Sequence, residues 1–174
     1  FLFSALSVGN LAKLYNLEII DLSPQVTHGG SMRYTLAKEG VYKISKNVEK
    51  IISNEINMGL NDYSSFNKFS DNIDNIGKEL INLLTKLKKQ GKKIVGYGAT
   101  SKSTTVNNYF NINSELIECI YDTTPIKHNT FTPGTNIPVV PYDGFHNSDP
   151  DYVLLYAWNH KEEILKKEKS FMSN

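Results

Sequence analysis

A glycine-rich turn contains the residue types that point most directly to chemistry. It reads Gly96-Tyr97-Gly98-Ala99-Thr100-Ser101-Lys102, and it lies between the short apolar run Ile94-Val95 and a helix predicted over 100–110. Glycines at such a turn allow a tight bend, and they let a phosphate reach main-chain N–H groups at the positive end of the following helix. The turn therefore predicts a site for a phosphate-bearing ligand, with a tight turn that binds nothing as the alternative.

An acidic residue lies where a dinucleotide-binding fold would place one. Asp122 follows the strand predicted over 117–121 and stands 24 positions after Gly98, close to the roughly 20 positions expected of an acid that binds a ribose. Ser101 replaces the third glycine of the dinucleotide pattern, however, and Lys102 follows it. A lysine there favours a diphosphate or another anion over a routine NAD turn, so both ligands stay open at this point.

A second glycine pair lies near the start of the chain. The run Thr27-His28-Gly29-Gly30-Ser31 connects two predicted strands, and Arg33 follows it. Gly29 and Gly30 would let a ligand approach the backbone closely. His28 and Arg33 would offer polar contacts to that ligand, with a structural role for His28 as the alternative.

Two later segments adjoin predicted strands. Pro133-Gly134-Thr135-Asn136 is expected at the carboxyl edge of the sheet, where ligands bind in open α/β folds, or as a rigid loop without function. Tyr156-Ala157-Trp158-Asn159 comes at the end of a strand predicted over 152–157. Asn159 is suited to capping the next helix, and Trp158 would either stack on a base or a sugar or lie buried.

The spacing of apolar residues predicts the elements that position these segments. From position 92 onward, short apolar strands alternate with helical patterns, which indicates an α/β fold with a small Rossmann-like parallel sheet and flanking helices. The predicted strands cover 94–95, 117–121, 137–140 and 152–157, and the predicted helices cover 100–110 and 159–169. Upstream, we predict a helix over 4–16, strands over 17–22 and 32–37 with Pro24 ending the first, and helices over 41–58 and 63–90.

The helix predicted over 63–90 carries a heptad-like seam. Apolar side chains recur along it at spacings of three and four, namely Phe66, Phe69, Ile73, Ile76, Leu80, Leu83 and Leu87. The seam fits either a coiled-coil dimer or a long connector that packs one stripe on neighbouring domains. We favour the connector because the seam is short.

The composition narrows the class of protein. The 174 residues include 19 basic and 18 acidic side chains, a net charge of +1, which gives no electrostatic footprint for nucleic acid or an anionic membrane. Cys119 is the only cysteine, which excludes an internal disulfide and fits a cytoplasmic protein. The histidines and Cys119 lack the paired spacing that a zinc site needs, and no apolar run approaches the ~18 residues of a membrane span.

Taken together, six motifs in this order resemble the C-terminal part of S-adenosylmethionine-dependent sugar C-methyltransferases, which act on nucleotide-linked ketodeoxysugars. The resemblance covers nearly the whole chain, and it is least diagnostic between 41 and 90. The motifs are Phe1-Leu2-Phe3-Ser4, His28-Gly29-Gly30-Ser31-Met32-Arg33, Gly96-Tyr97-Gly98-Ala99-x-x-Lys102, Asp122-x-x-Pro125-x-Lys127, Pro133-Gly134-x-x-Ile137-Pro138 and Tyr156-Ala157-Trp158-Asn159.

This resemblance implies a division of the chain. Residues 1–40 would be the tail of an upstream methyltransferase domain, 41–91 a helical connector, and 92–174 a Rossmann-like domain that helps to hold the sugar nucleotide. The catalytic base and most of the S-adenosylmethionine site would precede Phe1, so we expect the chain to be an inactive fragment. The absence of an initiator Met fits this expectation.

The resemblance also implies a reaction and a set of binding residues. A base removes the proton next to the sugar ketone, and the resulting enolate takes the methyl group of S-adenosylmethionine on carbon. The substrate-binding residues would be His28, Gly29, Gly30, Arg33, Gly96, Tyr97, Gly98, Lys102, Asp122 and Asn159. Two other functions remain open, an NAD(P)-binding module of a dehydrogenase or epimerase and a non-catalytic dimerisation module.

Overall fold

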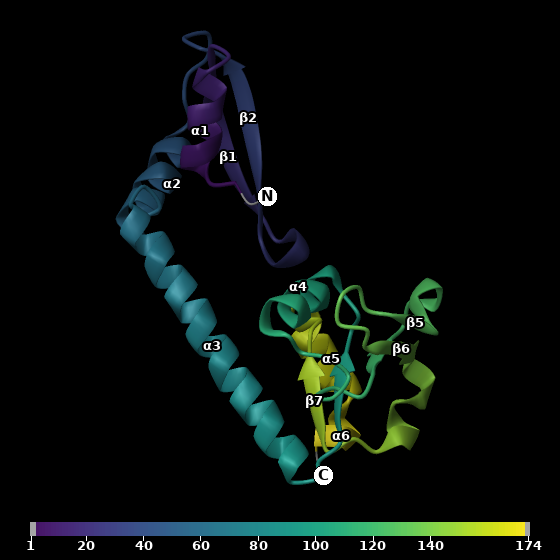
Figure 1. The fold of residues 1–174 in the computed structure, drawn as a ribbon. Helices are drawn as coiled ribbons and strands as arrows, with labels where there is room; N and C mark the ends of the chain where they lie inside the picture. The colour runs from purple at the N-terminus through teal and green to yellow at the C-terminus, as the bar shows by residue number, and fades with distance from the viewer. Residues whose placement is uncertain (1–2, 173–174) are drawn as a thin grey trace. The chain divides into compact units, whose positions relative to one another are not determined.

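The chain forms two compact units, which are described separately. The computed structural model describes residues 3–172, apart from the side chain of His28. Contacts divide the chain into Phe1–Asn72 and Ile73–Asn174, within one long helix (Figure 1). The domain boundaries predicted at 40 and 91 are based on the roles of the domains in the family that the sequence resembles. The contacts do not test them, so they stay predictions.

The first unit is a two-stranded antiparallel hairpin with two helices on one of its faces. Its core consists of Ala5, Ile19, Leu22 and Val48, which come from all but one of these elements. The elements are α1 (Ala5–Lys13), β1 (Leu17–Gln25), the short 3-10 helix η1 (Thr27–Gly29), β2 (Ser31–Lys38), α2 (Lys46–Asn57) and the start of α3 (Tyr63–Lys89). The predicted helix and hairpin near the N-terminus are confirmed, with Ser4 as the capping residue of α1.

Two predicted boundaries in this unit were wrong. Pro24 does not end the first strand, because β1 continues to Gln25 and Pro24 lies opposite Met32. A proline is tolerated at a sheet edge, where its missing N–H leaves no ladder bond unmade. The second helix begins at Lys46 and not at 41, since Ser45 caps it while donating its own N–H to the carbonyl of Ile20 at 2.8 Å.

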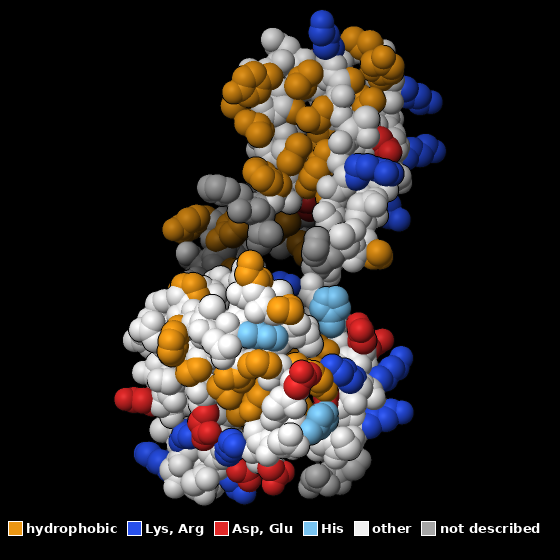
Figure 2. All heavy atoms as spheres, turned by 90° about the vertical axis from the view of Figure 1, so that its right-hand side faces the viewer, with side chains coloured by type: hydrophobic (Ala, Val, Ile, Leu, Met, Phe, Trp, Pro, Cys, Tyr) orange, Lys and Arg blue, Asp and Glu red, His pale blue; other side chains and the backbone are white. Residues whose placement is uncertain are grey.

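Many large apolar side chains of the first unit are exposed. Leu14, Tyr15, Val26 and Met58 each show more than two thirds of their surface. Figure 2 shows hydrophobic side chains gathered on one face of this unit. Apolar patches of such extent on soluble proteins usually mark surfaces that another part of a protein covers.

The second unit contains a five-stranded sheet in the order β5-β6-β4-β3-β7. All neighbouring pairs are parallel except that of β5 with β6. The strands are β3 (Ile94–Tyr97), β4 (Ile120–Asp122), β5 (Thr130–Phe131), β6 (Pro138–Pro141) and β7 (Tyr152–Leu155). The predicted α/β Rossmann-like fold is confirmed.

Helices cover both faces of this sheet (Figure 1). Ile94 faces a core shared with α3 and with α4 (Ser101–Phe110), while its neighbour Val95 faces a second core. The second core includes Ile164 from α5 (Lys161–Lys167) and Phe171 from α6 (Lys169–Met172). Successive residues of a strand point to opposite faces, so four residues of β3 serve both cores.

Three further predictions for this unit need correction. The strand predicted over 117–121 begins only at Ile120, because the preceding residues belong to the connection that follows α4. Cys119 lies in the apolar run 116–121, which predicts a small buried side chain, but it is only half-buried. The loop Pro133–Asn136 precedes β6 and therefore lies at the amino edge of the parallel strands, opposite the edge where we predicted it.

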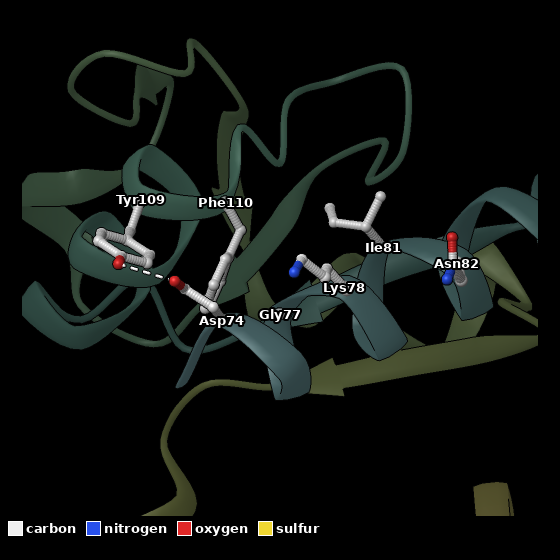
Figure 3. A pocket seen from close by; sticks show the side chains of 7 residues that line it. All are labelled: Asp74, Gly77, Lys78, Ile81, Asn82, Tyr109 and Phe110. Atoms are coloured by element: carbon white, nitrogen blue, oxygen red, sulfur yellow. Dashed lines mark hydrogen bonds between the residues drawn. The ribbon is translucent and has the colours of Figure 1, made fainter. Parts of the chain in front are cut away.

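No helix within the described residues is long and apolar enough to cross a membrane. The longest one, α3, is amphipathic, with Gly77, Leu84 and Leu87 buried. Gly77 lies directly under the ring of Phe110, where a β-carbon would come within 2.6 Å of three ring atoms (Figure 3). A glycine is therefore required at this crossing of α3 and α4.

A buried carboxylate links the C-terminal helices to the sheet. Glu168 is almost fully buried and accepts hydrogen bonds from the hydroxyls of Tyr97 at 2.9 Å and Tyr142 at 2.8 Å. His146 Nε2 lies 3.2 Å from the other carboxylate oxygen, without hydrogen-bond geometry. Burial, together with the bond to Glu168, raises the pKa of Tyr142 to about 12 and also raises the pKa of Tyr97.

We expect Gly77→Ala to destabilise the second unit. Alanine normally stabilises a helix by about 1 kcal/mol relative to glycine. Here the added methyl group overlaps the Phe110 ring, so the free energy of unfolding should fall by about 1–3 kcal/mol in urea denaturation. Asn75→Ala, on the exposed side of the same helix, is the control. A stabilised Gly77→Ala would contradict this packing, and adding Phe110→Leu should restore part of the loss.

We expect stability to fall in alkaline solution. Tyr142 keeps its proton in the folded chain up to a pKa of about 12, whereas an ordinary tyrosine has a pKa of 10.0. The contribution of protonated Tyr142 to the free energy of unfolding is complete below pH 10, and it is lost as the pH rises through 12. In urea denaturation between pH 8 and 12, Tyr142→Phe should show a smaller fall than the wild type, and the more exposed Tyr152→Phe should not. If Tyr142→Phe and the wild type lose stability equally between pH 8 and 12, the titration of Tyr142 does not contribute to the loss.

Candidate functional site

The strand order places a switch point between β3 and β7. After β3 the chain moves to β4 and then to β6 on one side, and it returns to β7 on the other side. Ligands of open α/β sheets bind outside the carboxyl ends of the strands at such a point. The glycine turn after β3 and the segment Tyr156–Asn159 after β7 meet here, so the structure brings two of the predicted segments together.

Close packing explains both glycines of the turn. Gly98 has a φ of +89°, and a β-carbon there would lie 2.8 Å from the β-carbon of Ala157. A β-carbon at Gly96 would lie 2.8 Å from side-chain atoms of both Ile120 and Tyr156. The sheet itself therefore requires these glycines, and they set the shape of the crevice whether or not a ligand binds.

The turn leads directly into the N-terminus of α4. Thr100 caps this helix, because its hydroxyl accepts the N–H of Ser103 at 3.1 Å. The hydroxyl of the buried Ser103 in turn donates to the carbonyl of Thr100 at 2.6 Å. The positive end of the helix dipole thus lies at the switch point, where it favours an anion.

Lys102 bridges the two sides of the crevice. Its ammonium group donates to the side-chain oxygen of Asn159 at 2.7 Å and lies 5.1 Å from the ring centroid of Trp158. Trp158 is 57% exposed, so the alternative in which it lies buried was wrong. The expected capping role of Asn159 was also wrong: α5 begins later, at Lys161, after the 3-10 turn η5 (Trp158–His160).

Asp122 supports the glycine turn from the other side. Only 6% of it is exposed, and its carboxylate accepts the N–H of Ala99 at 2.7 Å, the N–H of Thr124 at 2.7 Å and the ammonium of Lys127 at 3.3 Å. Lys127 also donates to the carbonyl of Ala99 at 2.9 Å. Burial raises the pKa of Asp122, but the hydrogen bonds from Thr124 and Ala99 outweigh it, so the pKa lies below the usual 3.8.

These bonds bear on the role predicted for Asp122. A ribose-binding acid must offer its oxygens to the ligand, whereas both oxygens of Asp122 are engaged by the turn itself. The geometry therefore favours a structural role. The bond from the Thr124 N–H to Asp122 is a local turn signature that can be recognised from sequence, whereas the contacts of Lys127 with Asp122 and Ala99 appear only in the folded chain.

A pocket of about 410 Å³ opens beside the turn, on the side of the sheet that α5 covers. Its lining comes from the ends of β3 and β4, from the segment after β7 and from α5. It includes Gly98, Thr100, Asp122, Tyr142, Ala157, His160 and Lys167. The groove drawn in Figure 3 lies instead at the C-terminal end of α4, beside Tyr109 and Phe110, away from the switch point.

The remaining predicted site residues lie in the first unit. Gly29 and Gly30 have φ values of +85° and +124°, so the turn between β1 and β2 requires glycine for its conformation. Arg33 is exposed on β2, opposite Ser23. The His28 side chain lies outside the described part of the structure. A ligand-binding role for these four residues stays a prediction.

The described residues contain no cluster of three or more His, Cys, Asp or Glu side chains that is suited to hold a metal ion. Lys102, Trp158, Asn159 and the N-terminus of α4 lie together at the switch point. Such an arrangement can bind and orient an anionic ligand with a planar ring. No general base is evident among these groups.

We expect Asp122→Ala to lower the free energy of unfolding by about 2 kcal/mol at pH 7, because it leaves two main-chain N–H groups without their acceptor. The difference from the wild type should persist down to about pH 4. Since the folded pKa lies below 3.8, it should then shrink as the pH falls through that pKa. Urea denaturation measures both effects, with the exposed Asp143→Ala as the control. Equal stability of Asp122→Ala and the wild type would show that the hydrogen bonds from Ala99 and Thr124 to Asp122 do not stabilise the fold.

Comparison with known proteins identifies the family of the chain. The family model described as "C-methyltransferase C-terminal domain" matches residues 26–174. The chain is also similar to the C-methyltransferase NovU of Streptomyces niveus, with 28% identity over 176 residues and 99% of this chain covered. It spans 42% of the length of that relative. The match to the family model covers most of the chain, and the chain therefore belongs to the C-methyltransferase C-terminal domain family.

Proposed function

We propose that this chain is the sugar-nucleotide-binding part of an S-adenosylmethionine-dependent C-methyltransferase that acts on a nucleotide-linked ketodeoxysugar. One observation carries the proposal: a lysine ammonium group is held over the switch point, beside the N-terminus of α4. Both features favour a diphosphate. A relative that is a C-methyltransferase, and the family of the chain, support the reaction class.

The state of Asp122 argues against the dinucleotide alternative. A dehydrogenase module needs an acid that is free to bind the adenosine ribose. The carboxylate of Asp122 is nearly fully buried and holds the turn through Ala99 and Thr124. A sugar nucleotide bound mainly through its diphosphate does not need that acid.

The role of this chain in the reaction would be binding and orientation. Proton removal next to a ketone gives an enolate, and the reacting carbon must then be aligned with the methyl donor. Holding the diphosphate and the nucleoside fixes the sugar at a set distance from the crevice. S-Adenosylmethionine supplies the methyl group when bound, and we assign its site and the catalytic base to a preceding domain of a longer protein.

The exposed apolar face of the first unit supports such a domain. The unit leaves large side chains such as Val26 and Met58 uncovered, which is typical of a surface that another domain covers. We therefore propose a methyltransferase domain as the intramolecular partner of the first unit.

Dimerisation is the second candidate function, and one observation favours it. Phe69, Ile76 and Leu83 recur every seven residues along α3, and each is more than half exposed. Such a stripe suits a second helix. Sedimentation equilibrium distinguishes the two uses of α3: a dimer that Ile76→Glu dissociates would support the seam, and a monomer would exclude it.

In calorimetry, we expect the whole chain to bind thymidine diphosphate or a thymidine-diphosphate-linked sugar, and not to bind NAD. Lys102→Met should weaken binding by about ten- to a hundredfold, because it removes a charge-assisted hydrogen bond. Lys78→Met removes the same charge on α3, beside the groove of Figure 3, and should bind like the wild type. Tight binding of NAD with no binding of the thymidine ligands would contradict the proposal.

A further inference from the structure

Three side chains meet over the switch point without serving the packing of the sheet. Lys102 comes from the first turn of α4, and Trp158 and Asn159 come from η5. The contact of Gly98 with Ala157 closes the floor of the crevice beneath them. Lys102 and Trp158 are exposed, so both can contact a ligand that binds at this edge of the sheet.

The position of Lys102 requires an explanation. Its side chain is exposed, and exposed lysines usually sample many conformers because their charge is well solvated. Here the ammonium is held by a neutral amide oxygen at 2.7 Å and by the face of an indole ring. Neither partner carries a charge, so both contacts are weaker than a contact of the same ammonium with a phosphate.

Asn159 has no competing structural task in this arrangement. It lies within η5 and does not cap α5, which has His160 at its N-cap position. Its side-chain oxygen instead accepts the hydrogen bond of Lys102. The hydrogen-bond acceptor of this ammonium group is therefore a neutral amide oxygen.

We propose that Asn159 is a placeholder for the phosphate of the ligand. This inference rests on the proposed function of the site. Asn159 holds Lys102 across the crevice and over Trp158, and an arriving diphosphate takes the ammonium from it. Removal of the ammonium frees the exposed face of Trp158 to stack on the base or the sugar of the same ligand. Lys102 is then a binding residue, while Asn159 is a positioning residue that sets the affinity.

The chain provides its own reporter for this exchange. Trp158 is the only tryptophan among the 174 residues, so the indole fluorescence of the whole chain comes from this ring. A cation over the ring and a stacked base both change that emission. A ligand that exchanges the partner of Lys102 must therefore alter the fluorescence, and a ligand that binds elsewhere need not.

Fluorescence and calorimetric titrations of the whole chain test the exchange. The probes are thymidine diphosphate, inorganic diphosphate and thymidine. Both diphosphates should alter the emission of Trp158 in the wild type. Asn159→Ala should bind thymidine diphosphate about three- to tenfold more tightly, because no neutral acceptor competes for Lys102. Its emission without ligand should also shift toward that of the complex.

A second variant tests the opposite direction. Asn159→Asp offers Lys102 a charged acceptor and repels a diphosphate, so it should weaken binding about tenfold or more. Lys102→Met should abolish the response of the emission to inorganic diphosphate. Asn147→Ala changes an exposed asparagine in another 3-10 turn, η4 (His146–Ser148), and is the control that should bind like the wild type.

The outcomes separate this inference from the proposed function. If thymidine diphosphate binds but the emission of Trp158 stays constant, or if Asn159→Ala binds more weakly, the placeholder is overturned and the site remains. If neither diphosphate binds in calorimetry, both the placeholder and the proposed site are overturned. Tighter binding by Asn159→Ala together with weaker binding by Asn159→Asp establishes the exchange.

Discussion

The contact of Gly98 with Ala157 is the constraint on which the geometry of the switch point depends. It lets the turn after β3 and the segment after β7 run against each other, with 2.8 Å between a hypothetical β-carbon and Ala157. From the opposite side, Asp122 and Lys127 bind the N–H and the carbonyl of Ala99. A turn held on both sides has little freedom to adapt to a ligand. Adjustment at this site must then come from side chains above the turn.

Buried polar pairs hold each face of the same sheet in a similar way. On the face covered by α4, the hydroxyl of Tyr156 donates to the fully buried Asn107 at 2.6 Å. On the other face, Glu168 accepts from Tyr97, one residue before Gly98. Such pairs are costly to break and bond in few geometries, so they specify how helices pack on a small sheet. The turn is therefore supported from below by packing that is independent of any ligand.

Local patterns predicted much of this fold. The bounds of α3 were predicted to within one residue because a long helix repeats its signal every three or four positions. The cap at Ser4 can be recognised from local sequence, because a serine directly before an apolar helical pattern is a preferred N-cap residue. Pro24 and the start of α2 were missed because they depend on partners distant in sequence, Met32 and Ile20.

The candidate site shows the same division. The sequence pointed to Asp122, but its donors are Thr124, two residues later, and Ala99, 23 residues earlier, and only the folded chain shows that they meet. The exposure of Trp158 depends on where η5 ends and α5 begins, which no short pattern encodes. A spacing can therefore identify a residue for a site without identifying what the residue binds.

This distinction changes what the glycine turn means. Gly96 and Gly98 are explained by their neighbours Ile120, Tyr156 and Ala157, so their presence says that strands approach closely and says little about the ligand. Our preference for a sugar nucleotide over a dinucleotide depends instead on the partners of two charged side chains, Asp122 and Lys102. The carboxylate of Asp122 is already hydrogen-bonded to the turn. The ammonium of Lys102 has a neutral partner, which binds it more weakly than a phosphate would. We therefore favour a diphosphate as the ligand, because the carboxylate of Asp122 is bonded within the fold and the ammonium of Lys102 has only neutral partners.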